Sequence, residues 1–139
     1  MNTAGYSGTP MAKKLGIKSG CRIRLVNPPA NYSDLLVDVP EDVAWLKDKT
    51  SAKDIIHYFT IKERELQRDI LLLRYEVFPN GMIWISWPKK SAKKDTDLTE
   101  DVIRKIALAN GLVDVKVCAI DETWSALKLV VPVKDRMVK

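Results

Sequence analysis

A chain of 139 residues with 46% hydrophobic and 29% charged residues has the composition of a globular domain that buries a single core. No apolar run reaches the roughly 20 residues of a membrane-spanning helix, and the start MNTAGYSGTPMAKK lacks the apolar centre of a secretory signal. We therefore expect one cytoplasmic domain over residues 1–139, with a flexible segment at 1–8 and no membrane partner.

Charge and cysteine usage narrow the function classes further. The net charge of +5 permits attraction to phosphate or nucleic acid without requiring it. The only histidine, His57, and two distant cysteines, Cys21 and Cys118, argue against a tetrahedral zinc site. Without a secretion signal, the cysteines should be reduced and buried. The sequence therefore predicts no metal site, and the turn after the first strand, which has two prolines and no glycine, predicts no bound cofactor.

The first half of the chain predicts short elements. TPMAKKLGI predicts one or two helical turns that begin near Pro10 and end at Gly16. The alternating run at 21–27 predicts a strand, which Pro28 and Pro29 end. A short helix at 31–39, a short strand at 43–47 and a buried strand at 54–61 follow.

The second half shows clearer periodicity. Between residues 62 and 78, apolar residues recur at spacings of four, three and four, which predicts a helix that the turn at 79–81 ends. The apolar run at 82–87 predicts a strand covered on both faces. Asp97 and Glu100 predict a capping box for the next helix. Its expected inner face is Leu98, Val102, Ile106 and Ala109, and it should end at Asn110-Gly111.

Two strands, at 113–120 and 127–133, complete the predicted order, and a turn at 121–125 joins them. Strands that alternate with crossover helices indicate an α/β fold of the three-layer, Rossmann-like type with a mainly parallel sheet. The last two strands are too close in sequence for a crossover helix. They should therefore add an antiparallel C-terminal edge strand.

The order of elements over residues 54–133 resembles the C-terminal half of a class I methyltransferase fold. In that family, a helix leads into a Pro-Gly-Gly type of turn, a strand, a helix and a closing pair of strands. The matching segments are 78–81, 82–87, 98–110, 113–120 and 127–133. The chain also resembles a family of uncharacterised bacterial proteins described as a domain of unknown function. That likeness lies in GYSGTPMAKKLGI (5–17), SWPKK (86–90), TDLTED (96–101) and VDVKVCAIDETWSALKLV (113–130).

The turn after the first strand bears on the activity that the methyltransferase resemblance implies. Enzymes of that fold carry a Gly-rich turn here, whose backbone N–H groups meet the cofactor. This chain has the segment Asn27–Ala30, where Pro28 and Pro29 donate no hydrogen bond, and it contains no Gly-x-Gly. Asp48 stands where a ribose-binding acid would follow the next strand. We therefore interpret the chain as a relative that kept the sheet and lost the cofactor turn.

Ligands of open parallel sheets bind beyond the carboxyl ends of the strands. Residues that follow three predicted strands should therefore converge on one crevice, and an anion is the ligand that its lysines favour. A salt bridge from Asp121 or Glu122 to Lys89 or Lys90 is expected across its mouth. The candidate ligand-binding residues are Asn27, Trp87, Lys89, Lys90, Asp121, Glu122 and Trp124.

Other polar residues suggest nucleic-acid binding or catalysis as alternative functions. Lys13 and Lys14 could join the lysines at 89–94 in one basic patch for nucleic acid, although no known nucleic-acid motif supports it. Ser86 is an available hydroxyl, but no serine or cysteine has an assignable base. His57 should be packed in the core, so no catalytic residue is predicted.

The sequence thus favours a non-catalytic ligand-binding or interaction domain on a methyltransferase-like scaffold, with a small anionic ligand or a protein as its partner. The alternative is an enzyme, either a divergent S-adenosylmethionine-dependent methyltransferase or one that acts on a small anionic substrate.

Overall fold

The computed structural model describes residues 10–136, so the segment expected to be flexible at 1–8 lies outside the described residues. Its α-helices are α1 (Met11–Lys14), α2 (Tyr32–Leu35), α3 (Glu63–Glu76) and α4 (Glu100–Ala109). Its strands are β1 (Arg22–Val26), β2 (Ala44–Leu46), β3 (Lys53–Phe59), β4 (Val77–Pro88), β5 (Val113–Ala119) and β6 (Trp124–Val130). Two short 3-10 helices, η1 (Lys90–Ala92) and η2 (Val133–Asp135), follow β4 and β6.

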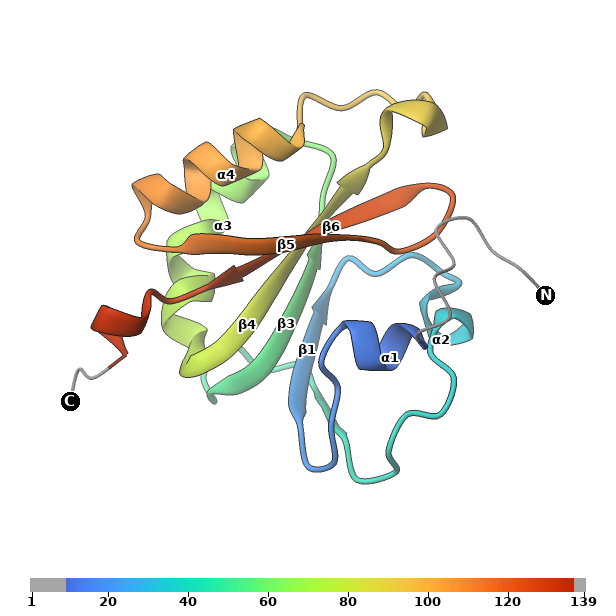
Figure 1. The fold of residues 1–139 in the computed structure, drawn as a ribbon, viewed down its shortest axis with the longest axis vertical. Coiled ribbons are helices and arrows are strands. Elements are labelled where there is room, and N and C mark those ends of the chain that lie inside the picture. Colours follow the sequence, from blue (N-terminus) through green and yellow to red (C-terminus); the bar gives the residue numbers. More distant parts are fainter. Residues whose placement is uncertain (1–9, 137–139) are drawn as a thin grey trace.

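Six strands form one sheet in the order β2-β1-β3-β4-β6-β5 (Figure 1). The first four are parallel, whereas β6 is antiparallel to both β4 and β5. The predicted α/β class with a mainly parallel sheet and an antiparallel C-terminal edge is therefore confirmed. The last strand, β6, is inserted beside β4, and β5 forms the edge. Consequently β4 and β5 run in the same direction and end at the same side of the sheet.

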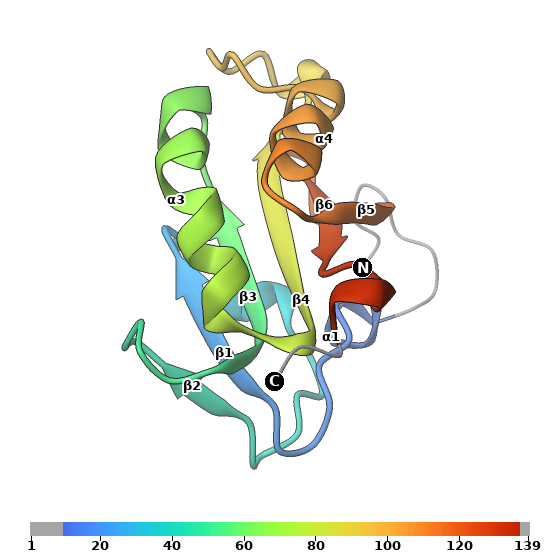
Figure 2. The same cartoon turned by 90° about the vertical axis from the view of Figure 1, so that its left-hand side faces the viewer.

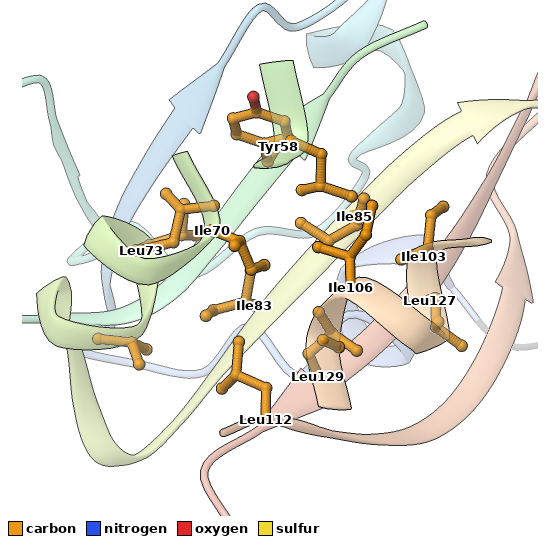
Figure 3. Close-up of a cluster of buried hydrophobic side chains, with 14 of the residues drawn as sticks. Tyr58, Ile70, Leu73, Ile83, Ile85, Ile103, Ile106, Leu112, Leu127 and Leu129 are labelled. Carbon is orange, nitrogen blue, oxygen red and sulfur yellow. The ribbon is translucent and has the colours of Figure 1, made fainter. Parts of the chain in front are cut away.

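Helices cover both faces of the sheet, which gives the expected three layers. Figure 2 shows α3 and α4 as neighbouring helices on one face, and Figure 3 shows the aliphatic core between these helices and the strands. On the other face, α1 and α2 pack over a second cluster that includes Ile23, Ile55 and Trp84. Among the described residues, no helix combines the length and apolar character needed to cross a membrane.

The start of α4 differs from the prediction. Thr99, and not Asp97, is the N-cap residue, and its hydroxyl accepts a hydrogen bond from the Val102 amide at 3.2 Å. Asp97 instead accepts a hydrogen bond from the Glu63 amide at 2.7 Å. Free amides at the start of α3 attract a carboxylate as strongly as those of α4 do. Asp97 therefore links the beginnings of the two helices, which a local capping pattern does not reveal.

The buried face of α4 is also rotated from the expected one. Leu98 and Ile106 are buried as predicted, but Ile103 and Ala107 complete the face, Val102 is only half-buried and Ala109 is exposed. A helix that begins at Glu100 presents positions 103, 106 and 107 to the sheet at the usual spacing of three and four.

The connection from β2 to β3 contains no helix. Both strands pair with β1, one on each side, so residues 47–52 must cross over β1. The Asp48 carboxylate organises this crossover, because it accepts hydrogen bonds from the amides of Thr50 at 3.2 Å and Ser51 at 2.7 Å. Asp48 is thus a turn residue. A short crossover leaves the space beside α3 less covered than a helix would.

Three buried charges hold α3 to the sheet beside this crossover. The Glu76 carboxylate accepts two hydrogen bonds of 2.7 Å from Arg24 on β1 and lies 3.0 Å from the Lys53 ammonium on β3. Lys53 has no exposed surface, and its ammonium also donates to the Ser51 carbonyl at 2.5 Å. One carboxylate therefore serves two buried cations from neighbouring strands.

Replacing Glu76 with glutamine should strongly destabilise the protein. The change keeps the shape but leaves Arg24 without a countercharge and Lys53 with only the Asp48 carboxylate, 3.8 Å away. Breaking a buried ion pair in this way costs about 3–5 kcal/mol. Urea unfolding at neutral pH measures the loss. The matched control is Glu100→Gln, which removes an ion pair with Arg104 at the protein surface and should leave the midpoint nearly unchanged. Equal, small effects of both substitutions would contradict this account of Glu76.

Candidate functional site

Asn27 lies at the carboxyl end of β1, as the sequence predicts. Its backbone has a φ of 54°, a left-handed conformation that asparagine tolerates better than most residues. Its side-chain amide donates a hydrogen bond to the Phe59 carbonyl at 3.3 Å, at the end of β3. This bond ties the ends of β1 and β3 together at the edge where ligands of such sheets bind.

Trp124 also reaches this edge, through an aromatic cluster that the sequence analysis missed. Its ring packs edge-to-face on Phe59 at 5.1 Å, and Phe59 contacts Tyr32 and His57. The alternation of His57 and Phe59 along one strand places both on one face, which is the signal that points to the cluster. Asn27 and Trp124 are therefore joined through Phe59.

Trp87 does not join them. It is buried in the cluster under α3 and α4, whereas Trp124 packs against the cluster on the α1 side. Ser86 and Pro88, its neighbours along β4, point to that other side because side chains alternate along a strand. The two tryptophans expected in one crevice thus lie on opposite faces of the sheet.

Asp121, a predicted ligand-binding residue, stabilises the turn between β5 and β6. The Asp121 carboxylate accepts hydrogen bonds of 2.8 Å from the amides of Thr123 and Trp124, which closes the hairpin. Glu122 is exposed. Lys89 is held at the turn by its backbone amide, which donates to the Thr123 carbonyl at 2.8 Å.

The salt bridge expected across the mouth of the crevice is absent. Within residues 10–136, neither Lys89 nor Lys90 forms an ion pair with Asp121 or Glu122. Asp121 is occupied by amides of its own turn, which provide nearer partners than a lysine ammonium. The single basic patch is not formed either, because α1 lies far from the loop after β4 in both views (Figures 1 and 2).

His57 is packed in the core, as predicted. Its Nδ1 atom is 2.9 Å from the Tyr32 hydroxyl and its Nε2 atom is 2.7 Å from the Ser86 hydroxyl. Burial lowers the pKa of His57 to about 3, so the ring is neutral at physiological pH. The prediction that no serine has an assignable base is wrong for Ser86. Because Ser86 and His57 have no exposed surface, however, this pair cannot meet a substrate.

A cavity of about 560 Å³ opens on the opposite face of the sheet, between α3, the carboxyl end of β1 and the helix-free crossover. No side chain that the sequence singled out, apart from Asn27, lines it. Its size suits a nucleoside-sized ligand. The lining residues are Arg24, Val26, Asn27, Lys49, Thr50, Tyr58, Arg68, Asp69, Leu72, Leu73, Tyr75 and Glu76.

Aromatic and charged groups meet in this cavity. The Tyr58 hydroxyl points out of the aliphatic core (Figure 3) and donates a hydrogen bond to Asp69 at 2.6 Å. Arg68 also donates two hydrogen bonds to Asp69, at 2.9 and 3.0 Å, and these lower the pKa of the carboxyl. Tyr75 is 72% exposed at the rim. The cavity thus offers an aromatic wall, an ionised carboxylate and surface cations.

Comparison with known proteins finds solved structures with a similar fold. No family model matches the sequence, and no curated protein matches it. Among solved structures, magnesium protoporphyrin IX methyltransferase from Synechocystis with bound SAH is similar, with a TM-score of 0.58 at 12% identity over 87% of this chain and 78% of that one. An S-adenosylmethionine-dependent methyltransferase from Clostridium acetobutylicum has a TM-score of 0.57 at 7% identity, over 86% and 87% of the two chains. The CcbJ methyltransferase from Streptomyces caelestis has a TM-score of 0.55 at 7% identity, over 84% and 85%.

These neighbours show that the chain has a methyltransferase-like α/β fold. They contradict the interpretation of the chain as a non-catalytic binding domain, because these solved structures of the same fold are methyltransferases. They favour the alternative of a divergent methyltransferase.

The usual cofactor turn of that fold does not fit this chain. Pro28 and Pro29 offer no N–H donors, the Asn27 side chain is bonded to Phe59, and the Asp48 carboxylate is bonded within its own turn. The cavity beside α3 has the donor and aromatic groups that the turn lacks. If a nucleoside cofactor binds, the cavity is the better match.

The buried His57 gives a testable pH dependence. The folded state keeps a pKa of about 3, whereas an unfolded histidine titrates near 6.5, so the unfolded state binds more protons as the pH falls below 6.5. Stability should therefore fall by about 2 kcal/mol between pH 6.5 and pH 5 from this group alone. Urea unfolding of the wild type and of His57→Gln at both pH values isolates the contribution of His57. The difference in unfolding free energy between the two proteins should shrink by that amount from pH 6.5 to pH 5. If the difference in unfolding free energy does not change with pH, His57 is not buried with a lowered pKa in the folded protein.

Proposed function

We propose that the chain is a divergent S-adenosylmethionine-dependent methyltransferase that binds its cofactor in the cavity between α3 and β1. The observation that carries this proposal is the position of the cavity. Its lining reaches the carboxyl ends of β1 and β3, at Val26, Asn27 and Tyr58.

The topology of the sheet explains why this position favours a ligand. From β1 the chain continues to β2 on one side, and the crossover then brings β3 to the other side. The gap between β1 and β3 is thus the point where the strand order reverses, and open α/β sheets bind ligands at such points. The crossover at 47–52 contains no helix, so the space beside α3 stays open to a ligand.

The groups in the cavity match the chemistry of this cofactor. The exposed ring of Tyr75 suits a purine face or a sulfonium, since aromatic faces attract cations. Asp69, held ionised, can accept hydrogen bonds from ribose hydroxyls or from an ammonium group. Lys49 and Arg68 at the surface can meet a carboxylate.

The residues of the chain would contribute binding and orientation to the reaction. When bound, S-adenosylmethionine supplies an electrophilic methyl group. Tyr75 would contact the cofactor at the rim of the cavity, and Asn27, fixed by its hydrogen bond to Phe59, would set the border of the site. The sealed His57 cannot accept a proton from the acceptor. Catalysis would therefore rest on proximity and on an acceptor that is already nucleophilic.

The acceptor would approach the same edge of the sheet from the other face. Lys89 is bonded to the hairpin turn, and Lys90 follows it in the chain. Glu122 lies in that turn, and Trp124 reaches Asn27 through Phe59. We propose this strip as the acceptor side, where the lysines favour an anionic substrate. We further propose that the protein is cytoplasmic and belongs to the uncharacterised bacterial family that its sequence resembles.

Calorimetric titration with S-adenosylmethionine, and with S-adenosylhomocysteine, tests the cofactor site. Both should bind with a saturable heat, and Tyr75→Ala should weaken binding at least about tenfold, equivalent to roughly 1.4 kcal/mol. Tyr75 is mostly exposed, so the change should hardly affect the thermal midpoint. Leu108→Ala, at an exposed apolar residue of α4 outside the cavity, is the matched control and should bind normally.

Two outcomes would refute the proposal. If neither compound produces heat or raises the thermal midpoint at millimolar concentration, the protein does not use this cofactor. If binding occurs but Tyr75→Ala and Asp69→Asn leave it unchanged, the cofactor lies elsewhere.

The acceptor side has a separate test. Lys89→Ala should slow methyl transfer to an anionic acceptor found by screening, while S-adenosylmethionine binding stays unchanged, because Lys89 does not line the cavity. The matched control is Lys94→Ala, an exposed lysine in the loop after β4. Equal rates for both variants would remove Lys89 from the acceptor side.

A further inference from the structure

A pair of lysines stands on the α1 side of the sheet, away from the proposed cofactor cavity. Lys116 on β5 and Lys128 on β6 are direct partners in the antiparallel register. Lys128 is also the partner of Trp84 on β4, whose indole belongs to the cluster under α1. The two lysines therefore extend outward from this core toward the β5 edge, with Lys116 exposed and Lys128 half-buried.

Further cations surround the pair. Arg136, just after η2, lies close enough to Lys128 to act on its charge, and its Nε atom donates to the Val131 carbonyl at 2.8 Å, which fixes the guanidinium. Lys14 at the end of α1 acts on Cys118, the next residue of β5 on the same face, together with Lys116. Four segments of the chain thus bring positive charge to one region.

Within residues 10–136, none of Lys116, Lys128 and Arg136 forms an ion pair with a carboxylate. The pKa of Lys128 is lowered by burial and by Lys116 and Arg136, and no acidic residue counteracts the shift. The nearest acid along β5, Asp114, is bonded to Arg104 at 3.0 Å. Residues 1–9 and 137–139 contain no aspartate or glutamate, so they supply no acidic side chain either.

Such an arrangement is unfavourable for the protein alone. Like charges directly opposite in an antiparallel pair lie only about 5 Å apart at Cβ and destabilise the sheet. The cost is removed when an anion lies between them, because phosphate oxygens accept hydrogen bonds from several ammonium and guanidinium groups at once. Local rules that are broken without internal compensation often mark functional positions.

We propose that the α1-side face of β5 and β6, with Lys116, Lys128 and Arg136 at its centre, binds the phosphate backbone of a nucleic acid. A polymer fits better than a small phosphate compound, because Lys116 is exposed at an open sheet edge that can follow an extended chain. The net charge of +5 adds long-range attraction. This inference goes beyond the proposed methyltransferase function and does not depend on it.

The site differs from the lysine loop that the sequence suggested for nucleic acid. Lys93 and Lys94 are exposed in that loop, after η1 at the far end of β4. They provide a control of identical charge. A double variant at 93 and 94 lowers the net charge by two, as does a double variant at 116 and 128.

Fluorescence anisotropy with labelled single-stranded RNA and with labelled duplex DNA tests the proposal in the full chain. Lys116→Gln/Lys128→Gln should weaken binding at least about tenfold and reduce the slope of log K against log salt by about 2, one for each lost phosphate contact. Lys93→Gln/Lys94→Gln should change binding by less than about threefold, through net charge alone. The double variant at 116 and 128 should melt no lower than the wild type, since it removes a repulsion.

Several results would overturn the proposal. Absence of binding by the wild type at low salt would do so, as would equal losses in the two double variants. Tripolyphosphate that competes as well as the oligonucleotide would identify a small phosphate ligand, and polyglutamate that competes equally would identify an acidic protein. A large drop in melting temperature for the variant at 116 and 128 would show that these lysines stabilise the fold.

Discussion

The Glu76 carboxylate, held between Arg24 and Lys53, is the interaction on which the organisation of this protein depends. It joins the end of α3 to β1 and β3, the two strands between which the chain reverses its order. Two buried cations require a buried anion, and a single carboxylate supplies it with three short contacts. Arg24 and Glu76 also form part of the lining of the cavity beside α3.

The short crossover at 47–52 is the second condition for that cavity. In its place a helix would cover the face of β1 beside α3, and the residues that line the cavity would become core. Asp48 stabilises the turn by accepting amide hydrogen bonds. Asp48, which the sequence suggested as a ribose-binding acid, therefore orders the crossover instead. A cofactor held in this protein would therefore rest on side chains of α3 and β3 more than on a backbone turn after β1.

The two faces of the sheet consequently carry different chemistry. On the α3 side, paired charges and aromatic rings surround a cavity. On the α1 side, His57 and Ser86 are sealed in the core, and the outer strands carry the directly opposed lysines Lys116 and Lys128.

Local patterns predicted the fold well, because the 3.6-residue period of α3 and the apolar run of β4 each depend on a few neighbouring residues. The position of Asn27 at the end of β1 followed from strand direction alone. The faces on which Trp87 and Trp124 lie could not be predicted in this way, because they depend on the register of β4 against β6.

The cavity itself was beyond reach of the sequence. Its lining includes Arg24 and Glu76, two charged residues of types that are rarely buried. It also includes Lys49 and Thr50, from a connection whose path over β1 becomes visible only when the strand order is known. The aromatic cluster of Tyr32, Phe59 and Trp124 likewise joins segments that are far apart in the chain.

The most direct test is a map of amide chemical shifts as S-adenosylhomocysteine is added to the isotope-labelled protein. If the cofactor binds beside α3, the largest changes should lie at Asn27, Thr50 and Tyr58 and along the second half of α3, while amides of α4 and β5 remain unchanged. Changes confined to the turn at 28–31, or no changes at saturating ligand, would contradict it.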